Sequence, residues 1–358
     1  MSSRKIAIVG GGLAGLYAAY RLQRLGIDWE LFEARPRLGG RILSTPAGGI
    51  DLGPTWFWPD CQPRLQDLAS ELGLETFAQY EDGDALIERW GTQVQRRPGY
   101  TSGNLSLRIE GGTGRLVQAL AERLPAQRLF LHSELQQIVL ENSGARLSLA
   151  CSGPVREGFR AVWLAIPPRL AARLHFTPAL PADVVKRLVE VPTWMASHAK
   201  YVARYARPFW RESGLSGDAF SGTGPLAEVH DAGHAGGAAL FGFLGPSAAQ
   251  RRALDGPALM AACRAQLVRL FGEAAAHPID ESLQDWAQEP LTATEDDQIA
   301  PRWHGLQDLT GLLDRHSQHR LRLIGSEAGG EQAGYMEGAL LAVERAVQAL
   351  PSDERLRP

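Results

Sequence analysis

The chain has 358 residues, of which 44% are hydrophobic and 22% charged, and its formal net charge is −3. This length predicts two domains in a soluble globular protein, and the charge balance gives no electrostatic case for nucleic acid or an anionic membrane as a partner. No apolar run reaches membrane-spanning length, and no signal peptide fits before the first apolar segment.

The cysteines are few and widely spaced, at Cys61, Cys151 and Cys263. They form neither a disulfide framework nor a zinc-binding spacing, so we expect a reducing, cytoplasmic compartment. Arginine is frequent and lysine is rare, which suits a GC-rich bacterial genome.

The first predicted unit is a strand, a glycine turn, a helix and a second strand. Ile6–Val9 is the first strand, and apolar positions then repeat with helical spacing up to a capping Gly26. Asp28–Phe32 is the second strand, and Glu33 follows it directly. The turn has the pattern G-x-G-x-x-G, formed by Gly10, Gly12 and Gly15.

This arrangement predicts a dinucleotide-binding site. Gly10 permits a tight turn, Gly12 lets the backbone approach a pyrophosphate, and Gly15 allows close packing of helix on strand. The helix N-terminus offers free N–H groups to the phosphates, and Glu33 can accept hydrogen bonds from a ribose. A glycine-rich turn that binds nothing is the alternative, which the flanking strands, helix and acid disfavour.

The segment 33–41, EARPRLGGR, continues this unit. It contains a second glycine pair, Gly39 and Gly40, followed by Arg41. An arginine at this place could bind phosphate oxygens through two hydrogen bonds.

Alternating strands are predicted over Arg128–Ala165, with a turn at Ser143-Gly144. Ala199–Tyr205 is predicted to be a long strand, a glycine-rich stretch follows over Gly214–Gly237, and residues 238–245 form another strand. Pro257–Phe271 has the apolar spacing of a helix.

Lys200 stands inside the strand predicted over Ala199–Tyr205. The chain has only two other lysines, Lys5 and Lys186. From the pattern alone, the favoured interpretation is a lysine whose stem covers apolar surface. The other interpretation is a desolvated lysine with a lowered pKa that donates a proton, accepts one or positions water.

The C-terminal part repeats the order of strand, turn and helix. Leu321–Ile324 is the predicted strand, and a turn follows at 325–327. A helix is predicted to open at 334–336, with apolar positions continuing to Leu350.

Several of these segments together resemble the flavin-containing amine oxidase superfamily. The resemblance rests on EARPRLGGR (33–41), DLGPTWFWP (51–59), EGGTGRL (110–116), AIPPRL and HFTPALP (165–181), AKYVARYARPFWR (199–211) and GSEAGGEQAGYMEGALLAVERA (325–346). These motifs occur in the order found in the family, and they span most of the chain.

The resemblance implies an α/β fold with a Rossmann-like FAD-binding domain interleaved with a smaller α+β substrate domain. The expected FAD-binding domain combines residues 1–60, 104–180 and 283–358. The expected substrate domain combines residues 61–103 and 181–282.

The resemblance also implies the residues of the site. In the family, a lysine at the position of Lys200 holds a water beside the flavin nitrogen that accepts hydride, and Tyr335 and Trp56 are expected to flank the substrate. The C-terminal helix would direct its positive end at the flavin. The residues expected to bind FAD are Gly10, Gly12, Leu13, Ala14, Gly15, Glu33, Ala34, Arg35, Gly39, Gly40, Arg41, Gly53, Pro54, Thr55, Leu135, Ser326, Glu327, Tyr335 and Met336.

The chain departs from monoamine oxidases in the stretch 286–297. Relatives attach the flavin covalently through a cysteine shortly before the C-terminal motif, and this stretch has none. We therefore predict non-covalent FAD. One aromatic residue of the family's cage is lost with the cysteine segment, while Tyr335 matches the other. Aromatic surface could come instead from Trp56, Phe57, Trp58 or Trp303, each of which could equally be a packing residue.

Two further polar groups have competing interpretations. Thr294-Glu-Asp-Asp297 could attract a cationic amine through Asp296 or Asp297. The favoured interpretation is a helix N-cap followed by acids in the first helical turn. His230 and His234 could bind a metal on a helix, but the glycines around them argue against a helix, so we predict no metal site.

The sequence therefore predicts an enzyme that oxidises the C–N bond of a small amine by hydride transfer to FAD, with oxygen or another acceptor reoxidising the flavin. A flavin desaturase or isomerase acting on a C–C bond and a non-catalytic flavoprotein are the alternatives. No serine-hydrolase elbow and no second complete dinucleotide unit is present. The substrate, the acceptor and the oligomeric state are left open.

Overall fold

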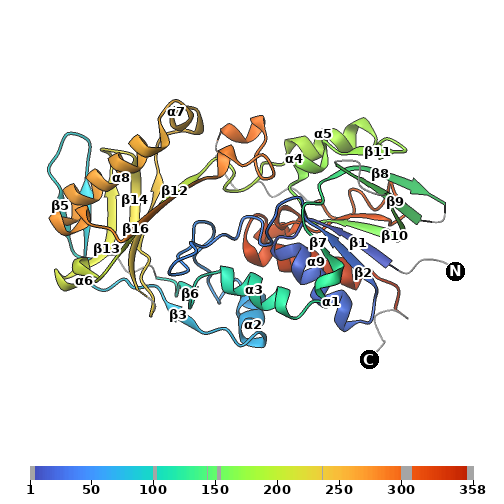
Figure 1. The fold of residues 1–358 in the computed structure, drawn as a ribbon, viewed down its shortest axis with the longest axis horizontal. Coiled ribbons are helices and arrows are strands. Elements are labelled where there is room, and N and C mark those ends of the chain that lie inside the picture. Colours follow the sequence, from blue (N-terminus) through green and yellow to red (C-terminus); the bar gives the residue numbers. More distant parts are fainter. Residues whose placement is uncertain are drawn as a thin grey trace.

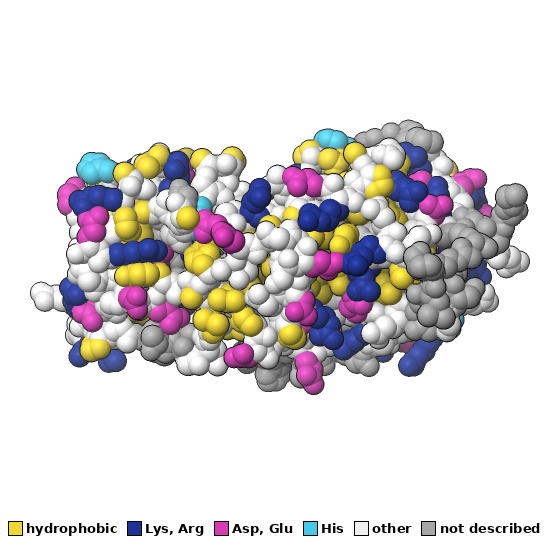
Figure 2. Space-filling view, turned by 90° about the horizontal axis from the view of Figure 1, so that it is seen from below, with side chains coloured by type: hydrophobic (Ala, Val, Ile, Leu, Met, Phe, Trp, Pro, Cys, Tyr) yellow, Lys and Arg dark blue, Asp and Glu magenta, His cyan; other side chains and the backbone are white. Residues whose placement is uncertain are grey.

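The protein is described by a computed structural model that covers residues 5–99, 103–142, 144–150, 155–235, 237–299 and 309–352. Figure 1 shows an elongated molecule with a β-sheet near each end. The space-filling view in Figure 2 shows two lobes with an indentation between them. We call the sheet that contains β1 the first sheet and the sheet that contains β12 the second sheet, and we call the lobes that hold them the first lobe and the second lobe.

The first sheet has eight strands within the described residues, in the order β11-β8-β9-β10-β1-β2-β7, and β17 also pairs with β10. The pairings among β1, β2, β7, β10 and β17 are all parallel. These strands span Lys5–Val9 (β1), Trp29–Phe32 (β2), Leu129–Phe130 (β7), Arg156–Leu164 (β10) and Leu321–Leu323 (β17). The predicted N-terminal strands and the α/β fold class are confirmed.

Apolar side chains on β1 are buried on both faces of the sheet. Ile6 and Ile8 belong to one core cluster, and Ala7 and Val9 belong to another. A continuous apolar run is typical of a parallel strand covered on both sides. The first cluster also holds residues of α1 (Leu13–Arg24), α3 (Gly114–Glu122) and α9 (Met336–Gln348).

Three further strands extend the first sheet on the far side of β10. They are β8 (Leu135–Glu141), β9 (Gly144–Leu149) and β11 (His175–Thr177). β9 runs antiparallel to both β8 and β10, and β11 runs parallel to β8. The alternating strands predicted for this region are confirmed, and Ser143 of the predicted turn lies outside the described residues.

The second sheet has the strand order β16-β12-β15-β14-β13-β4-β5. The β13–β4 pair is parallel and the other pairs are antiparallel. The strands span Asp84–Glu88 (β4), Gln95–Arg97 (β5), Ala199–Tyr205 (β12), Leu215–Ser221 (β13), Leu226–Asp231 (β14), Ala238–Leu244 (β15) and Asp280–Asp285 (β16). Two segments far apart in the sequence therefore build one sheet.

The two faces of the second sheet have different neighbours. Tyr201 and Ala203 lie in a cluster with residues of α8 (Gly256–Phe271), which confirms the predicted helix. Val202 and Phe241 lie in another cluster, together with Ile50 from the first lobe. Because side chains alternate along a strand, Lys200 shares the face of Val202 and is directed toward the first lobe.

The remaining elements connect the sheets. A two-stranded sheet is formed by β3 (Thr76–Ala78) and β6 (Leu107–Ile109). The other α-helices are α2 (Pro63–Glu71), α4 (Pro168–Ala171), α5 (Ala182–Glu190), α6 (Phe209–Glu212) and α7 (Ala248–Arg252). Short 3-10 helices cover Ala126–Arg128, Glu273–Ala276, Trp286–Gln288, Glu295–Gln298, Ser326–Ala328 and Gly330–Gln332.

Two features were not anticipated from the sequence. The glycine-rich stretch Gly214–Gly237 contains strands β13 and β14. Gly217, with a φ of 93°, lies inside β13 where its register with β4 shifts, and Gly224, with a φ of 104°, lies in the connection between the two strands. Helix α2 contributes Leu65 and Leu68 to the core cluster of α1 and α9, although a division at residue 60 assigns it to the substrate domain. The domain ranges themselves stay a prediction.

Among the residues that the structure describes, no helix combines the length and the apolar character needed to cross a bilayer.

Candidate active site

The N-terminus of α1 is open toward the glycine turn. Gly10 has a φ of 103°, and a Cβ on Gly15 would lie 1.9 Å from the carbonyl oxygen of Gly10. Gly12 is the N-cap residue, no side chain caps the helix, and no acid stands in its first turn. The leading N–H groups are therefore available to an anionic ligand.

Gly12 faces the second glycine pair, and packing within the protein does not require a glycine at this position. Gly12 and Gly39 form a parallel bridge. A Cβ on Gly12 would be 3.8 Å from both Gly39 O and Gly40 Cα, which is ordinary contact. The bare backbone at this position fits the close approach of a pyrophosphate, because a side chain would occupy the space between the turn and the ligand.

Glu33 is buried at the end of β2, with 3% of its surface exposed. Its Oε2 accepts a hydrogen bond from Gly11 N at 2.6 Å, and its Oε1 accepts one from Arg35 N at 2.8 Å. Ser133 N donates to Glu33 O at 2.8 Å, which brings the chain leading to Leu135 beside this acid. Glu33, the acid predicted to bind the ribose, thus lies at the carboxyl end of β2.

The second glycine segment is joined to the C-terminal turn. Arg41 binds both carboxylate oxygens of Glu327, at 2.7 and 3.1 Å, and donates to Ser326 Oγ at 3.0 Å. Burial acts to raise the pKa of Glu327, but the Arg41 cation outweighs it, so the pKa lies below its ordinary value. Arg41 therefore makes its bidentate contact with a carboxylate of the protein, and binding of phosphate by Arg41 stays a prediction.

Lys200 is buried where β12 meets the segment 53–55. It is 2% exposed, and its Nζ donates to Gly53 O at 3.2 Å and to Thr55 Oγ1. The Nζ also lies 3.9 Å from the centre of the Phe241 ring. Burial lowers the pKa of Lys200 to about 7, against the opposing attraction of Asp51. The lysine therefore exists in both protonation states near neutral pH.

Trp56 and Tyr335, which were expected to flank the substrate, have different neighbours. Trp56 donates from Nε1 to Gln79 at 2.8 Å, and its ring meets His230 and Phe241 at 5.0 and 5.2 Å between centres. Tyr335 packs against two other rings, Trp58 at 6.2 Å and Trp194 at 6.4 Å.

Trp194 is the residue that the sequence analysis missed. The only indication in the sequence was its position, five residues before the strand of Lys200. A lone tryptophan in a loop does not predict which residue it contacts. Trp303, another aromatic candidate, lies outside the described residues. Phe57 is fully buried in the core of the first lobe and donates and accepts backbone hydrogen bonds with Leu107.

The sequence favoured a helix cap here, and Thr294 is the N-cap residue of the 3-10 helix Glu295–Gln298, with Asp297 in the first turn of that helix. Asp297 accepts from Thr294 N at 2.8 Å and from Thr294 Oγ1 at 2.9 Å, which forms a capping box. It also accepts from Thr193 N at 3.0 Å and pairs with Arg169. Its carboxylate is thereby committed to the protein, whereas Asp296 is exposed.

His230 and His234 bind different carboxylates. His230 Nδ1 lies 2.8 Å from Asp218, and His234 Nδ1 lies 2.8 Å from Glu110. His230 thus lies on β14 with one acid, and His234 lies in the connection between β14 and β15 with another.

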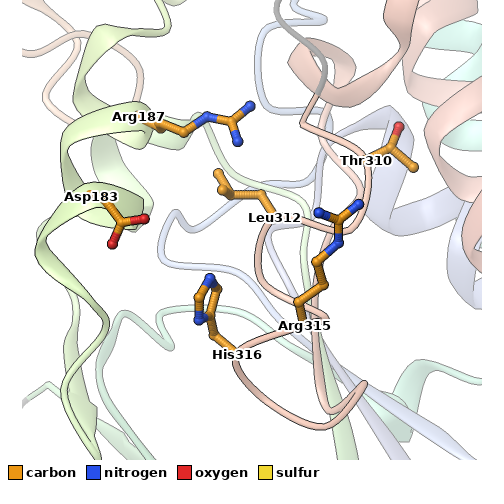
Figure 3. Close-up of a pocket in the computed structure, with 6 residues that line it drawn as sticks. All are labelled: Asp183, Arg187, Thr310, Leu312, Arg315 and His316. Carbon is orange, nitrogen blue, oxygen red and sulfur yellow. The ribbon is translucent and has the colours of Figure 1, made fainter.

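Two surface cavities lie away from Lys200. One, of about 310 Å³, lies between α5 and the segment 310–316 (Figure 3), and is lined by Asp183, Arg187, Thr310, Leu312, Arg315 and His316. The other, of about 740 Å³, lies beside α2 and α9. Neither lining contains Lys200, Trp56 or Tyr335.

The parallel strands β2, β1, β10 and β17 of the first sheet, the open glycine turn and the buried acid after β2 are the features of a dinucleotide-binding fold, and β12 of the second sheet carries the buried Lys200. The family model described as flavin containing amine oxidoreductase matches residues 83–351. The model described as NAD(P)-binding Rossmann-like domain matches residues 8–72.

Curated relatives and solved structures agree with this match. The chain is 23% identical to a probable flavin-containing monoamine oxidase A of Dictyostelium discoideum, covering 94% of both chains. It is 24% identical to putrescine oxidase of Kocuria rosea, covering 94% of this chain and 93% of that one. The structure of cyclohexylamine oxidase from Brevibacterium oxydans IH-35A superposes with a TM-score of 0.78 at 20% identity, covering 97% of this chain and 98% of that one.

The chain belongs to the flavin-containing amine oxidoreductase family. It is an FAD-dependent amine oxidoreductase, and the resemblance stated from the sequence is confirmed.

Proposed function

We propose that this enzyme binds FAD non-covalently, with the pyrophosphate at Gly12 and the reactive ring beside Lys200, and that it oxidises a small amine there. The observation that carries the proposal is Lys200 itself. A buried lysine with a pKa of about 7 stands between two lobes, at the point where the chain of Gly53 and Thr55 passes. FAD supplies the electron acceptor for a hydride equivalent from the carbon next to the amine nitrogen.

Lys200 positions a water molecule and exchanges a proton with it. The hydrogen bonds to Gly53 O and Thr55 Oγ1 fix the Nζ atom, and the ring of Phe241 excludes bulk water on one side. Because the pKa lies near 7, the amine can donate or accept a proton at neutral pH.

Two further features suit an electron-accepting site. Tyr335 is the N-cap residue of α9 and no side chain caps that helix, so its leading N–H groups can stabilise a negative charge, in addition to the carboxylate of Glu337 in the first turn, which is hydrogen-bonded to Leu65 N. Trp58, Trp194 and Tyr335 form an aromatic group in which burial raises the pKa of Tyr335 and keeps its hydroxyl neutral. An uncharged aromatic wall suits the neutral amine from which hydride is lost.

Non-covalent attachment is supported by the positions of the cysteines. The stretch 286–297 contains none, and Cys263 is buried in α8 behind the second sheet. Acid precipitation of the purified holoenzyme should release all of its flavin into the supernatant. Yellow colour that stays with the precipitated protein would contradict this part of the proposal.

We further propose that oxygen or another small acceptor reoxidises the flavin and that the enzyme works in the cytoplasm. In the part of the chain that the structure describes, Cys61 and Cys263 are free thiols, in keeping with a reducing compartment.

The test is anaerobic mixing of the holoenzyme with a panel of amines while the flavin absorbance is followed. An amine substrate should bleach the flavin, and oxygen should restore the colour. Lys200→Met should retain FAD but slow flavin reduction or reoxidation by roughly 100-fold, the usual contribution of a positioned proton-transfer group. Unchanged rates of both steps would remove Lys200 from the mechanism.

A further inference from the structure

Lys200 belongs to a row of side chains that crosses the second sheet on one face. Lys200 pairs with Phe243 of β15, and Phe243 pairs with Glu228 of β14. Glu228 pairs in turn with Phe220 of β13. Because directly paired residues lie on the same face, all four side chains share the face that is directed toward the first lobe.

Glu228 lies in this row between two aromatic side chains, Phe243 and Phe220. Two strand spacings separate it from Lys200, which is a distance of roughly 10 Å. The Glu228 side chain is 41% exposed, whereas Lys200 in the same row is buried. It is therefore a carboxylate that a ligand in the space between the lobes can reach.

The carboxylate of Glu228 is also less engaged than its neighbours. Its ion pair with His230 Nε2 is 3.8 Å long, beyond hydrogen-bond distance. Other acids of the second sheet are hydrogen-bonded to arginine at short distances: Glu88 to Arg269 at 2.8 Å, Asp231 to Arg211 at 2.7 Å, and Asp285 to Arg251 at 2.6 Å. Those carboxylates stabilise the fold, while Glu228 keeps hydrogen-bonding capacity for something else.

His230 holds Glu228 in the charged form. The imidazole is fixed by Asp218 at 2.8 Å and by the ring of Trp56 at 5.0 Å. The nearby His230 imidazole lowers the pKa of Glu228 below its ordinary value, against the effect of burial. A fixed negative charge between aromatic faces favours a cation, through both charge and ring contacts.

We propose that Glu228 is a specificity-determining residue that binds a second, non-reacting ammonium group of the substrate, so that the enzyme prefers diamines over monoamines. The proposal rests on the amine oxidation proposed above. The reacting nitrogen must be neutral to lose hydride from its neighbouring carbon, and a carboxylate beside it would hold it protonated. Glu228 lies far enough from Lys200 to bind the opposite end of the molecule.

Binding to the reduced holoenzyme tests this without turnover. With its FAD reduced by dithionite, the enzyme cannot accept a further hydride, so equilibrium dialysis measures affinity alone. The wild type should bind diaminohexane at least tenfold more tightly than hexylamine. Glu228→Gln should lower the affinity for diaminohexane by roughly 10- to 100-fold and leave the affinity for hexylamine unchanged. Glu122→Gln, which removes an equal charge from the exposed surface of α3, is the matched control and should change neither affinity.

The outcomes separate this proposal from the proposed function. The role of Glu228 would be overturned if the wild type bound the two ligands with equal affinity. It would also be overturned if Glu228→Gln lowered the affinity for both ligands by the same factor. If the two amines bleach the oxidised flavin equally well, amine oxidation stands and the preference for diamines fails. If neither bleaches the flavin but diaminohexane binding still depends on Glu228, the binding role stands and amine oxidation fails.

Discussion

At the scale of single residues, burial determines what Lys200 can do. Its strand begins and ends where the alternating pattern placed it, at Ala199–Tyr205. Its neighbours Gly53, Thr55 and Phe241 come from other parts of the chain, and no local pattern identifies them. The sequence therefore predicted the position of the lysine, and only the fold gives the environment that lowers its pKa.

The lowered pKa of Lys200 makes stability depend on pH. In the unfolded chain the lysine titrates near pH 10.4, and in the folded protein near 7, so between these values the unfolded state binds a proton that the folded state lacks. The contribution of Lys200 to the free energy of unfolding is lowest below about pH 7. It rises by roughly 4 kcal/mol as the pH increases to about 10.

Lys200→Met should lack this increase. Its free energy of unfolding, measured by denaturant titration, should fall progressively behind the wild type as the pH is raised from about 7 to about 10, whatever offset separates the two proteins at neutral pH. Parallel pH profiles of the two proteins would show that Lys200 titrates normally.

At the scale of elements, two glycines of the first turn serve different purposes. A Cβ on Gly15 would lie 1.9 Å from Gly10 O, while a Cβ on Gly12 would have only ordinary contacts at 3.8 Å. Gly15 is needed by the packing of α1 on β1, whereas nothing within the protein requires a glycine at position 12, and Gly12 is proposed to be needed by the ligand. The G-x-G-x-x-G pattern predicted both roles, because each follows from local backbone geometry.

Substitution by alanine should separate these roles. Gly12→Ala should leave the apoprotein as stable as the wild type, to within about 0.5 kcal/mol, but weaken FAD binding at least tenfold. Gly15→Ala should lower the stability of the apoprotein by about 3 kcal/mol or more, because backbone has to move. Thermal unfolding of both apoproteins and FAD titration of Gly12→Ala are the measurements. Normal FAD affinity in Gly12→Ala would place the pyrophosphate elsewhere.

A second element-scale contact joins α9 to α2. Glu337 in the first turn of α9 is 1% exposed and accepts from Leu65 N at 2.8 Å, at the start of α2. Glu337→Gln removes a buried charge from a helix N-terminus and should cost about 1 to 3 kcal/mol of unfolding free energy. Glu331→Gln, outside this contact, should be neutral in the same denaturant titration. Equal stability of the two variants would contradict the capping role.

Sequence patterns carried no information on contacts between residues that are distant in the chain. Tyr335 and Trp56 were both expected to flank the substrate, and no pattern indicated that Tyr335 packs against Trp58 and Trp194. The parallel pairing of β4 with β13 joins segments about 130 residues apart, and periodicity carries no information on which strands meet. Local patterns gave the strands, the turn and the caps, while the aromatic group and the Glu228 row depend on strand order and register.

At the scale of the whole molecule, the chain crosses between the lobes several times, and the residues proposed to bind FAD come from segments throughout this path. Gly12 and Glu33 lie near the start, Lys200 in the second sheet, and Tyr335 before the last helix. A ligand that touches all of these segments binds the folded state and has no site in the unfolded chain, so it must stabilise the protein as a unit.

FAD should therefore raise the stability of the apoprotein by about 2.7 kcal/mol when its free concentration is 100 times its Kd. Riboflavin is the matched control, since it has the ring but lacks the pyrophosphate that the α1 N-terminus and Gly12 are proposed to bind. Thermal unfolding of apoprotein with each ligand at equal concentration should show a large upward shift with FAD and a small one with riboflavin. Equal shifts would mean that the glycine turn does not hold the phosphates. No shift with either ligand would mean that the two lobes are not bridged by a flavin at all.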